Sequence, residues 1–541
     1  MELKDLLKGQ INTSFSKTVK RIGNFNLTGM VGAIASVYEE LNSSSNKAPL
    51  LVLCADSFDA QAIRATLFSL LPKVKIDYFS DYETLPYDTL SPHEDIISSR
   101  IELLAKLNDL ENGIVITNVM AIMPRMCPVD YIKQNSFAIA VGDTRDVTSL
   151  KQDLVKHGYL ACDQVLAPGE FAIRGSILDI YPMGAPMPYR IDFFDDEVDT
   201  IRTFDVDNQR SLDKIDKIAL LPAHEFPLDE KGISLFRSNY RDAFVGANLP
   251  NHTIYQAISR GAIPAGIEYY LPLFFSKVDT FFDYLNDKFK VITIDDVEKA
   301  ITDFDVEVHK RALEYAGNSD HPTLPCQDVF LTLKECSDSL KKFEQIALYK
   351  KKFEDTDLQK RGYYNTDFET IPDIAFNRSQ KESTNKFIAF CNDFIGEPKN
   401  LSKGNHGRIL ISALSEGRRQ SLREILPQVL VDRFGIKPAS SFDEFLKSDA
   451  PLMMTISPFD EGLFVKSAKI CFLTESELLG FKVVKQKRSS KRSAVSQDTI
   501  IKNLSSLTEG QIVVHIDHGI GRYRGLKTMK IGGVVGEYLT I

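Results

Sequence analysis

The strongest candidate for nucleotide chemistry is a glycine-containing stretch near the N-terminus. Residues 27–36 read LTGMVGAIAS. A phosphate-binding loop has the pattern GxxxxGK[ST], in which backbone amides hold the phosphates, the lysine reaches the β- and γ-phosphates and the hydroxyl binds Mg²⁺. This stretch has neither that lysine nor the adjacent hydroxyl. We therefore expect an ordinary helix N-terminus here, and neither ATP nor Mg²⁺ bound by this chain.

Other stretches resemble chemical motifs but lack the context that each motif needs. The string IDFFDDE at 191–197 resembles a strand that ends in Mg²⁺-binding acids, but without a phosphate loop a hairpin turn is the better interpretation. Residues 519–525 (GIGRYRG) miss GxGxxG by one residue in the last spacing and precede a strand-like stretch. His515 and His518 would face one metal only in a helix. We expect no catalytic residue and no metal site.

The most promising binding residues lie on the polar face of a predicted strand. Strand alternation over residues 189–194 (YRIDFF) places Arg190, Asp192 and Phe194 on one face. An aromatic side chain beside an arginine is typical of a protein–protein hot spot. Arg174 ends a preceding strand-like stretch. The alternative is a solvated sheet face with one exposed phenylalanine.

The elements that would position these residues form a split α/β unit with a β-rich insertion. Residues 1–130 alternate predicted strands with helices, which favours a parallel sheet. The strands are expected at 50–54, 74–79 and 113–119, and the helices at 60–71 and 96–107. Ser91–Glu94 (SPHE) is read as a capping box that starts the second helix. Residues 131–213 are strand-like, with a hairpin of 189–194 and 197–205, and 214–352 return to α/β with a charged helix at 341–352.

The remaining segments differ in composition. Residues 353–385 are polar and irregular and are interpreted as a connection. Residues 386–476 resemble a second small α/β unit, with strands at 408–412 and 469–473 and a helix at 417–426, and no role is assigned to it. Residues 477–505 form a linker in which Lys482–Arg492 is strongly basic, so it is either a phosphate-backbone contact or a solvated linker. Residues 506–541 show short strands, and we expect the natural chain to continue.

Length and composition indicate a multidomain globular protein. The chain has 541 residues, which suggests three or four domains, and 43% of them are hydrophobic. The net charge of −9 argues against coating of the whole surface by DNA. Seven cysteines without CxxC spacing favour reduced thiols in a cytoplasmic protein. No apolar stretch is long enough for a membrane span, and the N-terminus lacks the pattern of a signal peptide.

Four strings of this sequence resemble the bacterial transcription-repair coupling factor family. They are ETLPYDTLSPHEDIISSR at 83–100, GEFAIRGSILDIYPMGAPMPYRIDFFDDEVDTIRTFDVD at 169–207, LPAHEFP at 221–227 and VVHIDHGIGRYRGLKTMKIGGVVGEY at 513–538. The similarity runs over nearly the whole chain and is weakest over residues 300–480.

The resemblance implies a multidomain α/β architecture. Residues 1–130 and 214–352 would form a split UvrB-like α/β domain with a degenerate P-loop NTPase fold, and 131–213 a β-rich inserted domain that binds the damage-recognition ATPase UvrA. Residues 386–476 would be a second small α/β domain. Residues 506–541 would start a partial Tudor-like β module, similar to CarD, that binds RNA polymerase.

The resemblance also assigns residues and partners. Arg174, Arg190 and Phe194 match family positions that contact UvrA, and Ile516 is a plausible contact to the RNA polymerase β subunit. In the family, two further motor lobes hydrolyse ATP with Mg²⁺ and translocate on duplex DNA, and a C-terminal domain masks the UvrA surface. We therefore expect an adaptor without enzymatic activity of its own. The alternatives are a UvrB-like ATPase or helicase, and a nonspecific DNA-binding module that uses 482–492.

Overall fold

The computed structural model of the chain contains two compact units. One comprises residues 1–206 and 210–483, and the small one comprises 207–209 and 484–541. The structure describes residues 15–16, 18–43, 47–244, 252–316, 321–375, 381–396, 406–459, 461–480, 510, 512–515, 519–531 and 534–540. Ile516 and the basic stretch 482–492 lie outside the described residues.

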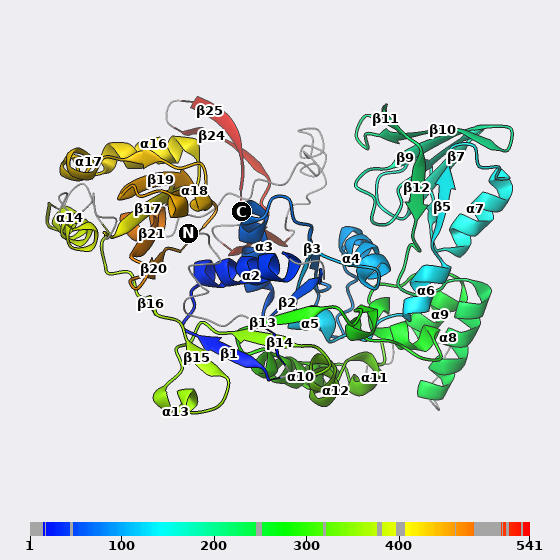
Figure 1. Cartoon of the computed structure of the whole chain (residues 1–541). Helices are drawn as coiled ribbons and strands as arrows, with labels where there is room; N and C mark the ends of the chain where they lie inside the picture. The colour runs from blue at the N-terminus through cyan, green and yellow to red at the C-terminus, as the bar shows by residue number, and fades with distance from the viewer. Residues whose placement is uncertain are drawn as a thin grey trace. The chain divides into compact units, whose positions relative to one another are not determined.

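A seven-stranded parallel sheet forms the centre of the split α/β unit (Figure 1). Its order is β15-β1-β14-β13-β2-β4-β3. The strands are β1 Lys20–Gly23, β2 Leu50–Cys54, β3 Ile76–Phe79, β4 Ile114–Asn118, β13 Lys290–Ile294, β14 Gln345–Leu348 and β15 Tyr363–Asn365. Strands from both sides of the insertion are thus interleaved in one sheet. The central strands β2 and β4 are buried along their whole length, as expected for a parallel sheet covered on both faces.

Helices cover both faces of this sheet (Figure 1). Alternate residues of β2 face opposite cores: Val52 packs in the cluster with α2 (Leu27–Asn42) and α3 (Ser57–Leu70), and Leu53 in the cluster with α4 (Glu94–Leu107). The second cluster also includes residues of α10 (Val297–Glu314) and α12 (Leu333–Leu340). The other helices of this unit are α5 Val119–Ile122, α6 Val129–Gln134, α8 Glu230–Ala243, α9 Thr253–Ser259, η2 Ile267–Phe274, η3 Phe281–Tyr284, α11 Cys326–Val329 and α13 Asp355–Leu358.

The β-rich insertion is built on a six-stranded sheet of order β11-β10-β9-β8-β7-β6. Its strands are β6 Leu160–Ala161, β7 Glu170–Arg174, β8 Ile177–Ile180, β9 Tyr189–Phe194, β10 Glu197–Phe204 and β11 Ser211–Ile215. Neighbours are antiparallel except β6 and β7. Helix α7 (Val147–Lys156) covers one face, where Leu150 and Leu154 pack in one cluster with Phe171 and Ile191. We call the opposite face, which carries Arg190, the outer face.

Two further strands join the insertion to the split unit. β5 (Phe137–Ala140) precedes the inserted sheet in the chain, and β12 (Lys217–Leu220) follows it. The two pair in antiparallel register. The chain therefore enters and leaves the insertion along one two-stranded ribbon.

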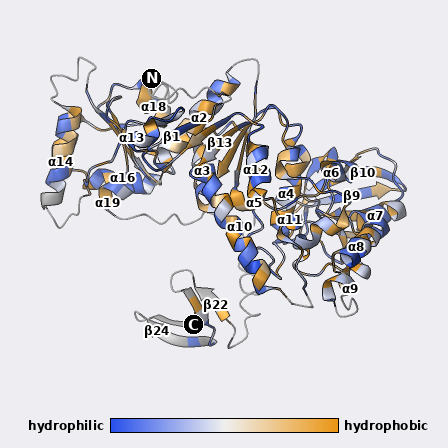
Figure 2. Ribbon diagram, turned by 90° about the horizontal axis from the view of Figure 1, so that it is seen from below, coloured by the Kyte–Doolittle hydropathy of each residue, from blue (hydrophilic) through white to orange (hydrophobic). Residues whose placement is uncertain are grey.

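The second small α/β unit has a sheet of order β16-β20-β21-β17-β19-β18. Its strands are β16 Phe368–Glu369, β17 Arg408–Ala413, β18 Lys437–Pro438, β19 Leu452–Ile456, β20 Leu463–Val465 and β21 Ile470–Thr474. Its helices are α14 Lys381–Ile395, α16 Glu416–Ile425, α17 Gln428–Phe434, α18 Phe442–Lys447 and α19 Glu475–Leu479. Helix α2, which is largely apolar in Figure 2, shares a hydrophobic cluster with β2 and with Phe472 of this sheet. Contact with both sheets explains why α2 is buried nearly all round.

The small compact unit, which comprises residues 207–209 and 484–541, contains two antiparallel hairpins in its described part. β22 (Ile512–His515) pairs with β23 (Gly519–Arg522), and β24 (Leu526–Ile531) pairs with β25 (Val534–Leu539). This is the β-rich pattern expected from the sequence. These two hairpins alone do not establish the Tudor-like module that the resemblance implies.

The structure corrects three local predictions. Residues 341–352 do not form a helix, because β14 places Ile346 and Leu348 in the buried sheet between β1 and β13. Ser91 does not cap α4: His93 is the N-cap. The Ser91 hydroxyl instead contacts the carboxylate of Glu268. The segment 353–385 is not wholly irregular, since it supplies a strand to each of two sheets.

Two other local predictions are confirmed, one for residues 27–36 and one for the hairpin of β9 and β10. Residues 27–36 lie in an ordinary helix, capped by Asn26, and β9 and β10 form the expected hairpin around Asp195 and Asp196. Among the described residues, no helix is long and apolar enough to cross a membrane.

Candidate functional site

Three of the four predicted binding residues lie on the outer face of the inserted sheet: Arg174, Arg190 and Phe194. Along β9, Ile191 and Phe193 are buried while Arg190 and Phe194 point to the other face, so the predicted alternation is confirmed. Phe194 ends β9, just before the turn at Asp195, and its side chain is 74% exposed. A large aromatic group exposed at the end of a rigid strand is suited to filling a pocket in a partner.

Arg190 is held by a nearly buried carboxylate. The sheet register places Asp179 of β8 directly opposite Arg190. The Arg190 Nε and Nη2 atoms donate to the two Asp179 oxygens at 2.7 and 2.8 Å. These hydrogen bonds raise the pKa of Arg190, and its guanidinium lies 5.0 Å from the ring centre of Phe204. The guanidinium is therefore fixed in one orientation before any partner arrives.

Arg174 reaches the same carboxylate from the other side. Its Nη2 atom lies 3.8 Å from an Asp179 oxygen and donates to the backbone oxygen of Asp163 at 3.0 Å. The Arg174 side chain is 54% exposed, whereas that of Asp179 is 3% exposed. The structure thus brings the two predicted arginines together on Asp179. Phe194 lies four residues along the strand from Arg190, at about 13 Å.

Sequence reasoning missed two residues of this face. Asp179 fixes both arginines, and its sequence signal was a lone acid in the otherwise apolar strand ILDI. Arg202 of β10 lies opposite Arg190 across the two strands. Its Nη1 atom lies 3.9 Å from a carboxylate oxygen of Asp192. Neither pairing could be read from the sequence, because strand register depends on turn geometry.

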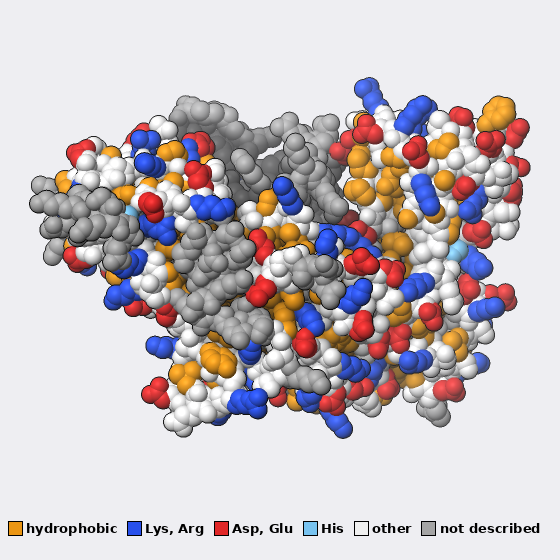
Figure 3. Space-filling model, in the orientation of Figure 1, with side chains coloured by type: hydrophobic (Ala, Val, Ile, Leu, Met, Phe, Trp, Pro, Cys, Tyr) orange, Lys and Arg blue, Asp and Glu red, His pale blue; other side chains and the backbone are white. Residues whose placement is uncertain are grey.

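The outer face also has a small hydrophobic core of its own. Val165, Ala172 and Phe204 are buried together, with Cys162 and Tyr181 packed against them. The segment 162–168 between β6 and β7 therefore packs onto the sheet. In the space-filling view, acidic and basic side chains are interspersed over the lobe that holds β7–β11 (Figure 3). The paired charges of the outer face therefore lie next to this buried cluster, since the Arg190 guanidinium packs on Phe204.

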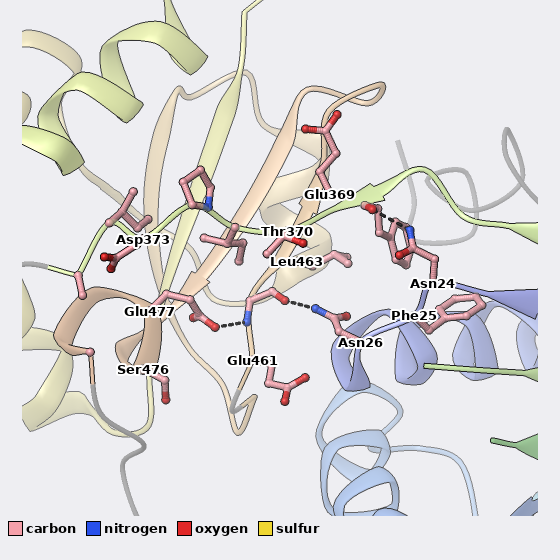
Figure 4. Close-up of a pocket in the computed structure, with 17 residues that line it drawn as sticks. Asn24, Phe25, Asn26, Glu369, Thr370, Asp373, Glu461, Leu463, Ser476 and Glu477 are labelled. Carbon is pink, nitrogen blue, oxygen red and sulfur yellow. Dashed lines mark hydrogen bonds between the residues drawn. The ribbon is translucent and has the colours of Figure 1, made fainter. Parts of the chain in front are cut away.

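The N-terminus of α2, where a phosphate loop would lie, is occupied by groups of the same chain. The Asn26 side chain accepts a hydrogen bond from the Gly29 amide at 2.8 Å. The Leu27 amide donates to the Glu461 carboxylate at 3.3 Å, and the Thr28 hydroxyl donates to the Glu461 backbone oxygen. Figure 4 shows Asn26 also bonded to the loop of Glu461 and Gly462. A helix N-terminus favours an anion, and here a carboxylate of the second α/β unit takes that position.

The carboxyl edge of the parallel sheet carries acids that the sequence analysis did not single out. Asp295 and Asp296 follow β13 directly. Lys350, which follows β14, pairs with Asp59 and lies 3.4 Å from Asp295. Burial alone would lower the pKa of Lys350, but the bonds to Asp59 and Asp295 raise it. The lysine therefore neutralises carboxylates that could otherwise hold a cation.

These residues do not fit a bound nucleoside triphosphate. At the N-terminus of α2, where the phosphates would lie, the phosphate-binding lysine is missing. The Leu27 amide there donates to the Glu461 carboxylate instead. A cavity of about 610 Å³ beside this helix N-terminus is lined by acids, amides and hydroxyl groups, and the described residues around it include no basic side chain that could pair with phosphates (Figure 4). Within the described ranges, no cluster of three or more His, Cys, Asp or Glu side chains could hold a metal ion.

Comparison with known proteins identifies the domains. Residues 137–226 match the UvrB interaction domain, 402–478 match the MFD D3 domain, and 507–541 match the CarD-like/TRCF RID domain. The first match contains the whole outer face. The fold and these matches define a multidomain α/β protein that contains a UvrB interaction domain, an MFD D3 domain and a CarD-like/TRCF RID domain.

Whole-chain similarity identifies the family. The chain is 36% identical over 511 residues to the transcription-repair-coupling factor of Haemophilus influenzae, covering 94% of this chain and 43% of that protein. It is 35% identical over 516 residues to that of Escherichia coli K12, covering 95% and 43%. The chain therefore belongs to the transcription-repair coupling factor family, as the sequence strings indicated. It spans less than half the length of these relatives.

Proposed function

We propose that this chain is the partner-recruiting part of a transcription-repair coupling factor. Its inserted domain binds UvrA through the outer face, and its residues 506–541 bind the RNA polymerase β subunit. The observation that carries the first proposal is the exposed Phe194 on the same face as two arginines fixed on Asp179, within a matched UvrB interaction domain. Support for the second is the match to the CarD-like/TRCF RID domain, and Ile516 remains its predicted contact residue.

The outer face suits recognition of an acidic, partly apolar surface. Phe194 supplies the apolar contact, and the exposed part of Arg174 can donate charge-assisted hydrogen bonds. Because Asp179 already orients both guanidinium groups, less side-chain entropy is lost on binding. Arg190 shares this carboxylate, so it positions the face as well as contacting the partner.

We assign the enzymatic activity of the family to regions outside this chain. The whole protein would be an ATP-dependent DNA translocase that displaces RNA polymerase stalled at lesions and delivers UvrA in the cytoplasm. ATP, Mg²⁺ and most contacts to duplex DNA would belong to its motor lobes. The carboxylate of Glu461 at α2 and the ion pairs of Lys350 favour this assignment over a UvrB-like ATPase or helicase. The alternative of DNA binding through 482–492 rests on residues outside the described ranges.

A titration against purified UvrA tests the main proposal. Phe194→Ala removes the exposed ring without disturbing a buried group, and we expect at least tenfold weaker binding. Arg174→Ala leaves Asp179 bonded to Arg190 and should also weaken binding. Leu313→Ala on α10 is a matched control, because Leu313 is equally exposed (76%) but belongs to the split unit. Binding of Phe194→Ala with the affinity of the control would contradict the proposal.

A further inference from the structure

We infer that Leu166, together with Leu160, is a second apolar anchor of the UvrA-binding face. The partner footprint would then run from Phe194 across the two arginines to the segment that follows β6. This inference rests on the proposed function and extends it to residues that no motif indicated. Its evidence is the placement, rigidity and exposure of these two leucines.

Glu170 places Leu166 on the outer face. Its carboxylate accepts hydrogen bonds from the amides of Leu166 at 2.7 Å and Ala167 at 2.9 Å. Glu170 alternates along β7 with Phe171, which packs in the inner core with α7, so Glu170 and Arg174 share the outer face. The backbone of Asp163 is bonded to Arg174. The segment that presents Leu166 is thus tied to a predicted binding residue.

The same segment is anchored by a buried side chain. Val165 is fully buried against Ala172 and Phe204, and the side chain of the next residue, Leu166, is 55% exposed. Scattered exposed leucines are ordinary on protein surfaces. This leucine differs because its backbone is fixed on both sides by hydrogen bonds and by a buried neighbour. Little entropy would be lost when a partner covers it.

Leu160 extends the apolar area along the edge of the sheet. It pairs directly with Glu170 across β6 and β7, so its side chain points to the outer face. It is 64% exposed. The outer face therefore has apolar groups on both sides of the charged centre at Arg174 and Arg190.

The dimensions agree with one partner covering both sides. Three strand spacings separate β6 from β9, which is about 14 Å. A standard interface covers about 800 Å² on each partner, equivalent to a disc about 32 Å across. A footprint centred on the arginines would include both Phe194 and Leu166. The matching surface of UvrA would carry two apolar pockets with acidic groups between them.

The test is a UvrA titration with Leu166→Ser, Leu160→Ser and Val155→Ser beside Phe194→Ala. Val155 is 52% exposed on α7, which covers the opposite face of the sheet, so its variant is the matched control. We expect about tenfold weaker binding for Leu166→Ser, a smaller loss for Leu160→Ser and no change for Val155→Ser. Leu166→Met should retain the wild-type affinity. Thermal unfolding of each variant verifies that the inserted domain is folded.

The outcomes distinguish a failure of this inference from a failure of the proposed function on which it rests. If Phe194→Ala weakens binding but Leu166→Ser and Leu160→Ser match the control, the second anchor is wrong and the proposed function stands. If wild type does not bind UvrA, both fail. If Leu166→Ser unfolds the domain, Leu160→Ser decides the question, since Leu160 lies on β6 and is not a member of the buried cluster of Val165, Ala172 and Phe204.

Discussion

Arg100 and Glu225 form an ion pair buried beneath the junction of the split unit and its insertion. The Arg100 Nε atom lies 3.3 Å from a Glu225 oxygen, and the two side chains are 0% and 5% exposed. The guanidinium lies between the rings of Phe79 and Tyr82, 4.3 and 4.1 Å from their centres. Tyr82 donates its hydroxyl to the other Glu225 oxygen at 2.6 Å. This network joins α4 to the chain just after it leaves β12.

We expect Arg100→Leu to destabilise the junction strongly. Removing one partner leaves the Glu225 carboxylate buried without its counter-charge, which costs roughly 3–5 kcal/mol. The double variant Arg100→Leu/Glu225→Gln should recover part of this loss. Urea unfolding followed by tyrosine fluorescence measures the change. Equal stabilities of the single and double variants would contradict the expected cost of an unpaired Glu225 carboxylate.

Arg190→Ala should affect folding as well as binding. It removes the two hydrogen bonds to Asp179, whose carboxylate is nearly buried, and should cost roughly 2–4 kcal/mol. Arg190→Ala/Asp179→Asn should restore much of the stability but not the binding of UvrA. Thermal unfolding and titration of the same samples distinguish the two effects. If the double variant binds like wild type, Arg190 has no role in recognition.

Glu461→Ala should loosen the contact between α2 and the second α/β unit. It removes the carboxylate bonded to the Leu27 amide at the helix N-terminus, an interaction worth about 0.5–2 kcal/mol. We expect faster hydrogen exchange at residues 27–29 and no gain of ATP hydrolysis, because the phosphate-binding lysine is still missing. Glu461→Gln, which keeps an acceptor, is the matched control. ATP turnover by either variant would contradict the degenerate-site interpretation.

Glu268 should make stability depend on pH. Burial raises the pKa of this carboxyl from 4.5 to about 7. The folded state then holds a proton that the unfolded state has released, so the free energy of unfolding falls as pH rises from about 4.5 to 7. Glu268→Gln keeps a partner for Ser91 and should flatten this part of the profile. Unfolding midpoints at pH 5, 6, 7 and 8 test the slope, and an unchanged profile in the variant would rule out Glu268 as its source.

Local patterns in the sequence predicted local structure well. The period-two alternation of YRIDFF placed Arg190 and Phe194 on one face because one face of β9 is buried. The same type of reasoning failed at 341–352, where charged residues flank the short apolar run of β14. Tertiary burial between two strands outweighed the helical preference of the surrounding lysines.

Long-range partners could not be predicted in this way. Asp179 meets Arg190 through strand register, and Glu461 meets Leu27 across 434 residues of chain. Neither of these two contacts produces a periodic pattern in the sequence that could reveal it. The neutralising pair of Lys350 and Asp59 is equally nonlocal, since it depends on the order of strands in the sheet.

The ribbon of β5 and β12 makes the insertion a transferable cassette. Phe137 and Leu220 are cross-strand partners, so the two ends of the inserted domain lie one strand spacing apart. A scaffold needs only a single gap of that width to accept such a cassette, and its own strand order is left unchanged. Evolution could therefore exchange or tune the recruiting surface without rebuilding the domain that carries it.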